Sequence, residues 1–145
     1  MDTAAELSRT LGPLRRAVLR ATRTAANLPD LPEAQIELLR TLIAEGPLNP
    51  RTVAARLRIA PSTVSNLVKT MSATGLIERE TAPNDLRTVH LTASAKARDL
   101  LDRYDRTSTA TLAHSIGLLS ANERNTLEAA LPILGRLTEQ LEVRN

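Results

Sequence analysis

Four polar side chains share one face of a helix predicted over residues 61–74. They are Ser62, Ser65, Asn66 and Lys69, at positions i, i+3, i+4 and i+7. One face over, an apolar stripe with the same spacing consists of Val64, Leu67, Val68 and Met71. Short hydroxyl and amide side chains beside one cation are groups that hydrogen-bond to base edges in the major groove of DNA. The first turn, with Ser62 and Thr63, also leaves backbone N–H groups free for a phosphate.

Taken alone, this pattern also fits the ordinary polar face of an amphipathic helix, so the neighbouring segments decide between the two interpretations. Asn49 and Pro50 supply a cap and a first-turn proline for a short helix over residues 50–57. A turn over residues 58–60 leads to the next helix, which opens with Pro61 and ends at Gly75. Two short helices joined by a tight turn predict a helix-turn-helix.

After Gly75 the hydrophobic period changes from helical to alternating. Residues 76–80 and 88–91 are short β-like runs around a polar tip at residues 82–85, which predicts a hairpin, or wing. Arg87 near this tip has the chemistry to enter the minor groove, and Asp85 has the chemistry to orient it by a charge-assisted hydrogen bond. The alternative is a surface ion pair that contributes about 0 to 1 kcal/mol.

Long helices are predicted on both sides of this unit. Thr3 and Glu6 are spaced as a capping box for a helix over residues 3–26, in which Pro13 predicts an irregularity or a later start of the regular helix. A second helix opens at Pro32 and Glu33. The fold class expected is therefore mainly α with a small β-hairpin wing, a winged helix-turn-helix with long terminal helices.

Two further helices follow the wing. Thr92 is expected to cap a long helix after the second strand, and Ser120 with Glu123 forms a capping box for the last helix. Pro132 is expected to bend or interrupt that last helix. Leucines along both terminal segments form apolar stripes that a small winged-helix core would not cover.

Composition excludes several kinds of chemistry. The 145 residues contain no Cys, which removes disulfides, thiolate zinc sites and cysteine nucleophiles. Tyr104 is the one aromatic residue, so base stacking on aromatic platforms is not expected. His90 and His114 form no close pair, and we expect no metal and no cofactor. No set of nucleophile, base and orienting group is visible, so an enzyme is not expected.

The net charge of +3 is concentrated in the middle of the chain. Basic and acidic residues balance over residues 1–49 and over residues 93–145, whereas residues 50–92 carry six basic and three acidic residues. Such a local excess is typical of contact with phosphates, although a charge of this size also occurs on ordinary surfaces. No apolar run reaches the length of a membrane span, and the first residues lack the pattern of a secretory signal, so a cytoplasmic location is expected.

The order of these features resembles the MarR family over residues 32–97. The matching segments are the helix over residues 35–46, the short helix over residues 50–57, the recognition helix from Pro61 to Val68, the run Gly75 to Arg79, and the wing residues Asp85, Arg87, Leu91 and Thr92. Two positions depart from the family. Asn66 stands where many members carry Arg, and Leu86 stands where a basic residue is common.

This resemblance implies a homodimer that regulates transcription, either as a repressor or as an activator, with repression favoured. It implies a helical dimerisation region at residues 1–30 and 93–145 and a DNA-binding lobe at residues 31–92, within a single compact domain. Two recognition helices related by a two-fold axis would read half-sites about 10 bp apart in a pseudo-palindromic operator. Family members commonly respond to small effectors, and Arg15, Arg16, Arg20 and Arg23 of the first helix are candidates to attract an anion or are ordinary surface charges.

The residues expected to contact DNA come from both short helices and the wing. They are Arg51, Ser62, Thr63, Ser65, Asn66, Lys69, Thr70, Arg79, Asn84, Asp85 and Arg87. The alternative function is a winged helix that uses the same face to bind a partner protein. Strong salt dependence of duplex binding would distinguish DNA contact from protein contact, because phosphate contacts release counterions.

Overall fold

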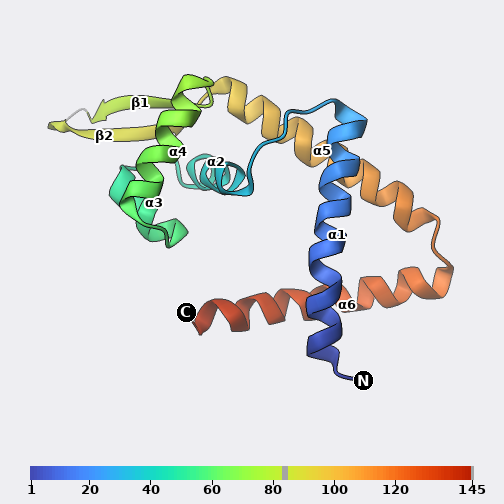
Figure 1. The fold of residues 1–145 in the computed structure, drawn as a ribbon. Helices are drawn as coiled ribbons and strands as arrows, with labels where there is room; N and C mark the ends of the chain where they lie inside the picture. Colours follow the sequence, from blue (N-terminus) through green and yellow to red (C-terminus); the bar gives the residue numbers. More distant parts are fainter. Residues whose placement is uncertain (83–84, 145) are drawn as a thin grey trace. The chain divides into compact units, whose positions relative to one another are not determined.

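The computed structural model describes the backbone of residues 1–82 and 85–144 and the side chains of residues 1–81 and 88–144. The described residues form helices and one antiparallel hairpin, in agreement with the predicted fold class (Figure 1). In chain order the elements are α1 Thr3–Ala26, α2 Glu33–Glu45, α3 Pro50–Leu57, α4 Pro61–Ala73, β1 Ile77–Ala82, β2 Asp85–Ala93, α5 Ala95–Gly117 and α6 Ala121–Val143.

The chain divides into two compact units. One consists of Thr22–Thr107, and the other of Met1–Ala21 with Ser108–Asn145. The buried apolar side chains lie in the first unit, which contains α2, α3, α4, the hairpin and the first half of α5. Its fully buried side chains include Leu38, Leu39, Leu42, Val53, Val64, Met71 and Leu91. This core fixes the positions of the two short helices and the wing relative to one another.

Local capping explains where α3 and α4 begin and end. The Asn49 side chain accepts a hydrogen bond from the Thr52 N–H at 2.8 Å, which confirms the predicted cap. Arg58 follows α3 in a left-handed conformation, with φ of 55°. Pro61 opens α4, and Gly75, with φ of 76°, lies beyond its end and allows the chain to turn into β1.

The wing is longer than the sequence predicts. Strands β1 and β2 pair from Ile77 opposite Ala93 through Thr81 opposite Val89, with an irregular register after Thr81. Leu91 also exchanges two backbone hydrogen bonds with Leu48, at 2.7 and 3.2 Å. Leu48 therefore pairs with one edge of β2, while β1 pairs with the other edge through Thr92 and Ala93.

The expected cap of the fifth helix at Thr92 is therefore wrong, because Thr92 lies within β2. The Ser94 hydroxyl oxygen instead accepts a hydrogen bond from the Ala97 N–H at 3.1 Å, and α5 starts at Ala95. The same hydroxyl donates to the Gly75 carbonyl at 2.6 Å. Ser94 therefore joins the start of α5 to the turn that follows α4.

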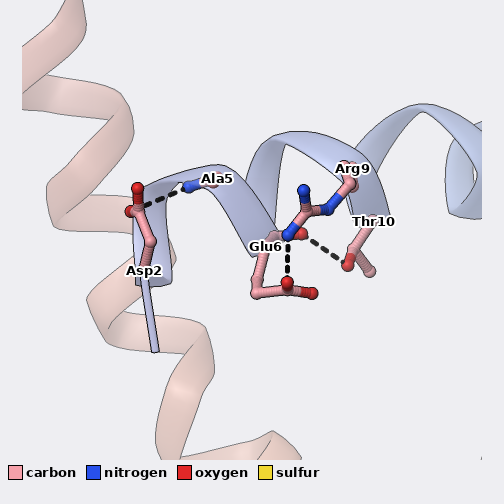
Figure 2. A network of polar contacts seen from close by, with 5 residues as sticks. All are labelled: Asp2, Ala5, Glu6, Arg9 and Thr10. Carbon is pink, nitrogen blue, oxygen red and sulfur yellow. Dashed lines mark hydrogen bonds and ion pairs between the residues drawn. The ribbon is translucent and has the colours of Figure 1, made fainter.

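The start of α1 also differs from the prediction (Figure 2). The Asp2 carboxylate, rather than the Thr3 side chain, accepts a hydrogen bond from the Ala5 N–H, at 3.1 Å. Glu6 pairs with Arg9 and does not complete a capping box. Helix α1 runs through Pro13 without the predicted break, because a proline removes one backbone hydrogen bond and the other turns of this 24-residue helix remain.

The capping box of α6 is confirmed. Ser120 accepts from the Glu123 N–H at 3.1 Å, and the Glu123 carboxylate accepts from the Ser120 N–H at 2.9 Å. Pro132 does not interrupt α6, which continues to Val143. None of the helices in the described part of the chain has the length and hydropathy to cross a membrane.

Candidate DNA-binding interface

Helix α4 separates its apolar and polar residues as predicted. Val64, Val68 and Met71 are buried against the core, and Leu67 is half-buried. The polar residues expected to contact DNA are all exposed on this helix, and they are Ser62, Thr63, Ser65, Asn66, Lys69 and Thr70. The Ser65 hydroxyl donates to the Pro61 carbonyl at 3.2 Å, so its oxygen remains available as an acceptor. The helix therefore presents a continuous polar surface.

A hollow of about 250 Å³ lies between α4 and the wing. It is lined by Pro50, Ser65, Val68, Arg79, Val89 and Leu91. Arg79 stands directly opposite Leu91 in the sheet register, so both side chains lie on the face of the wing that is turned toward α4. The fold thus brings Ser65 of the recognition helix and Arg79 of the wing to the same hollow.

A second hollow, of about 310 Å³, joins the start of α3 to the wing and is lined by Asn49, Pro50, Arg51, Thr88 and Val89. Arg51 is exposed and lines this hollow together with two residues of β2. The predicted interface lacks Asn49, Thr88 and Val89. Val89 could have been found, because it shares the strand face of Leu91. Asn49 was interpreted as a cap alone, and Thr88 had no local signal.

The two faces of the wing differ in charge. Glu78 stands opposite Thr92 and Glu80 opposite His90, and these four residues share the face that does not carry Arg79. The acidic residues of the described wing therefore lie away from the side that lines the hollows. The basic side of the wing and the polar side of α4 form one surface.

Three cations of this surface have no acidic partner among the residues whose side chains are described. Among the described residues, Arg51, Lys69 and Arg79 are exposed and form no ion pair, whereas Arg56 of α3 pairs with Glu45 at 2.8 Å. Unpaired guanidinium and ammonium groups around a polar helix produce a positive potential suited to phosphates. Asn84, Asp85 and Arg87 of the predicted interface lie outside the residues whose side chains are described.

No group of three His, Cys, Asp or Glu side chains in the described parts of the chain is placed to hold a metal ion. His90 is half-buried on the acidic face of the wing, and His114 is exposed near the end of α5. The chemistry of the site is therefore that of hydrogen-bonding side chains and unpaired cations.

A short helix, a turn, an exposed polar helix and a hairpin follow one another in this chain as they do in a known family. The sequence model of the MarR family matches residues 30–88, which include α2, α3, α4 and most of the wing. Over these residues the chain is similar to the MarR family. This confirms the resemblance on which the expected interface was based.

Relatives and solved structures of the same kind extend beyond the winged helix. An HTH-type transcriptional regulator of Mycobacterium tuberculosis is 26% identical over 107 residues, which are 74% of this chain and 75% of the relative. FabT of Streptococcus pneumoniae, solved in complex with DNA, has a TM-score of 0.71 at 20% identity, covering 95% of this chain and 99% of FabT. An organohalide-sensing transcriptional regulator, RdhR, solved with 2,4-dichlorophenol bound, has a TM-score of 0.66 at 22% identity, covering 97% and 84%.

Proposed function

We propose that this chain is a homodimeric, sequence-specific DNA-binding transcriptional regulator of the MarR type. The observation that carries the proposal is the surface formed by the exposed polar face of α4 and the side of the wing that carries Arg79. Its three cations have no acidic partner among the described residues. The DNA complex of the structural relative FabT supports duplex DNA as the partner.

In this proposal α4 enters the major groove. Ser65 and Asn66 are short enough to approach base edges, and the amide of Asn66 matches the paired donor and acceptor of adenine. Arg51, Lys69 and Arg79 bind phosphates on either side of the groove and fix the orientation of the helix. Arg87 of the wing supplies the minor-groove contact.

The second unit supports the homodimer. Residues 1–21 and the described residues from 108 onward contain no buried side chain, although α6 alone is 23 residues long. Its leucines are largely exposed, with 56% of Leu131 and 57% of Leu141 accessible. A helix gains most of its stability from packing an apolar face, so these helices require a partner surface. A second copy of the chain supplies it, with residues 1–30 and 93–145 as the dimerisation region and residues 31–92 as the DNA-binding lobe.

We further propose that the protein is a repressor that dissociates from its operator when a small-molecule effector binds. The bound dichlorophenol of the structural relative RdhR supports an effector of small, lipophilic character. An effector releases DNA only if it binds the DNA-free conformation more tightly than the bound one. Candidates are therefore screened by their effect on operator affinity.

The test is a titration of the dimer against duplex DNA from upstream of its own gene and against a scrambled duplex, at several salt concentrations. Preference for the upstream duplex, with affinity that falls steeply as salt rises, is the expected result. Lys69→Gln should lower the affinity and the salt slope, whereas Arg103→Gln, an exposed charge on α5, serves as the matched control. Binding that is weak, equal for both duplexes and independent of salt would contradict the proposal.

A further inference from the structure

The left-handed backbone conformation of Arg58 is unusual in this chain. Of the described residues, those with positive φ are Gly46, Gly75, Asn27 and Arg58. Glycine adopts this conformation without steric conflict, and Asn tolerates it better than other residues do. Arg58 has φ of 55°. Its Cβ makes this conformation strained, and its side chain, unlike that of Asn, does not relieve the strain by a local hydrogen bond to the backbone.

The helix-turn-helix requires this conformation of the backbone. The Arg58 N–H donates to the Ala54 carbonyl and ends α3, and the Ile59 N–H donates to the same carbonyl at 3.1 Å. Three residues later Pro61 begins α4. A glycine at position 58 would make the same turn with less strain, so the reason for an arginine there must lie in its side chain.

The side chain of Arg58 is exposed, and it forms no ion pair or hydrogen bond with other described residues. Arg56, two residues earlier, differs because it is paired with Glu45 at 2.8 Å. Arg58 therefore does not stabilise the fold through a salt bridge. Its charge remains available for a partner outside the chain.

The position of Arg58 complements the cations already assigned to the interface. Arg51 and Arg79 line the hollows beside the wing, at the start of α3 and on β1. Arg58 follows the last residue of α3, about 10 Å along the helix axis from Arg51, and shortly precedes the start of α4 at Pro61. The major groove is about 12 Å wide, so a helix within it has phosphates on both sides.

We propose that Arg58 binds a backbone phosphate across the major groove from the phosphates bound by Arg51 and Arg79. The strained turn is then retained because a glycine would lose this contact. The inference rests on the proposed DNA-binding function and adds a residue that the sequence did not indicate.

Three substitutions separate the charge of Arg58 from its backbone strain. Arg58→Gly removes both, Arg58→Gln removes the charge and keeps a side chain in the left-handed conformation, and Arg58→Lys keeps both. Arg103→Gln removes one exposed positive charge from α5 and is the control for net charge. Each purified dimer is measured for thermal unfolding and for operator affinity at several salt concentrations.

Arg58→Gly should raise the Tm by about 2–4 °C at matched protein concentration, because the strain is relieved, and should still weaken DNA binding. Arg58→Gln should weaken binding to the same extent, roughly tenfold, without the rise in Tm. Each dimer loses two contacts, so the slope of log affinity against log salt should fall by about 2 in both variants. Arg58→Lys should retain most of the affinity, and Arg103→Gln should retain the slope.

A stabilised Arg58→Gly dimer that binds the operator with unchanged affinity and slope would overturn the proposal. Equal binding by Arg58→Gln and the wild type would do the same. If the wild type itself shows no salt-dependent duplex binding, the proposed function is wrong, and the proposed phosphate contact of Arg58 is wrong as well. The wild-type titration therefore separates the two failures.

Discussion

The guanidinium of Arg40 on α2 donates to both carboxylate oxygens of Asp105 on α5, at 2.7 and 3.0 Å. The hydrogen bonds that Arg40 donates to Asp105 outweigh partial burial and raise the pKa of Arg40 above its ordinary value. Asp105 lies two residues before Thr107, which is the last residue of the compact unit Thr22–Thr107. This pair is therefore placed to hold α5 on the winged-helix lobe close to that boundary.

A double-mutant cycle with Arg40→Ala and Asp105→Ala should give a coupling energy of about 0.5–1 kcal/mol in the free energy of unfolding. This coupling energy is low for a bidentate ion pair because about half of each side chain is exposed and solvent screens the charges. The coupling should decrease as salt rises. Urea unfolding of the four proteins measures it.

The exposed pair of Arg106 with Asp102, one turn apart on α5, is the control for this cycle. Its coupling should be smaller, about 0.3–0.5 kcal/mol, because it joins no separate elements. Zero coupling between Arg40 and Asp105 at low salt would show that the pair does not hold α5 in place.

Ser94→Ala should lower the free energy of unfolding by about 1–3 kcal/mol. The Ser94 hydroxyl is buried, donates to the Gly75 carbonyl at 2.6 Å and accepts from the Ala97 N–H. Its removal leaves the buried Ala97 N–H and the Gly75 carbonyl without this partner. Urea unfolding is the measurement. Ser115→Ala, at an exposed position of α5, should change the stability little, and an equal loss in both variants would contradict the role of Ser94.

The elements that the sequence predicts correctly depend on short-range signals. Asn49 and Thr52 are three residues apart, as are Ser120 and Glu123, so their caps follow from local geometry. The cap of α5 lies at Ser94 and not at Thr92, because β2 pairs with β1 as far as Ala93 opposite Ile77. A pattern within β2 does not contain that contact.

The same distinction applies to the interface. The polar face of α4 is a consequence of helical periodicity and could be selected from the sequence. The approach of Arg51 to Thr88 joins α3 to β2 and depends on the packing of the whole lobe. The left-handed backbone of Arg58 is likewise a property of the turn, since an arginine in the sequence gives no sign of its φ angle.

Asn66→Ala should change the preference among operator variants, with about 1–3 kcal/mol lost where Asn66 contacts a base. Lys69→Ala should instead weaken binding to all duplexes and reduce the salt slope, because a phosphate contact carries no sequence information. Competition titrations with single base-pair variants of the operator measure both effects. If Asn66→Ala lost the same binding energy on every sequence, Asn66 would contact the backbone and not a base.

The capping box of α6 should make its first turn sensitive to acid. The hydrogen bond from the Ser120 backbone N–H to the Glu123 carboxylate holds the pKa of Glu123 below its ordinary value of 4.5. Because the folded pKa is the lower one, the carboxylate stabilises the folded state above pH 4.5, and this contribution is lost as pH falls through the folded pKa. The advantage of the wild type over Glu123→Gln should therefore shrink on acidification.

Amide hydrogen exchange at the start of α6, followed from neutral to acidic pH, measures this loss. Thr126→Ala, an uncharged substitution in the next turn, corrects for general effects of pH on the helix. A wild-type advantage that stays constant down to low pH would show that the charge of Glu123 does not support the cap.

Substitution of Leu131 and Leu141 by Glu should dissociate the dimer. Both side chains are more than half exposed on α6, which has no buried residue of its own, and the proposed dimer buries their apolar surface against a second copy. Two carboxylates in that interface would have to be desolvated without partners. Asn125→Glu adds a charge on the polar side of the same helix and should leave the dimer intact.

Sedimentation equilibrium gives the mass of each variant. Operator titration should show that the monomer loses most of its affinity, since one half-site contact replaces two. A Leu131→Glu, Leu141→Glu protein that remained dimeric and bound its operator normally would place the dimer contact outside α6.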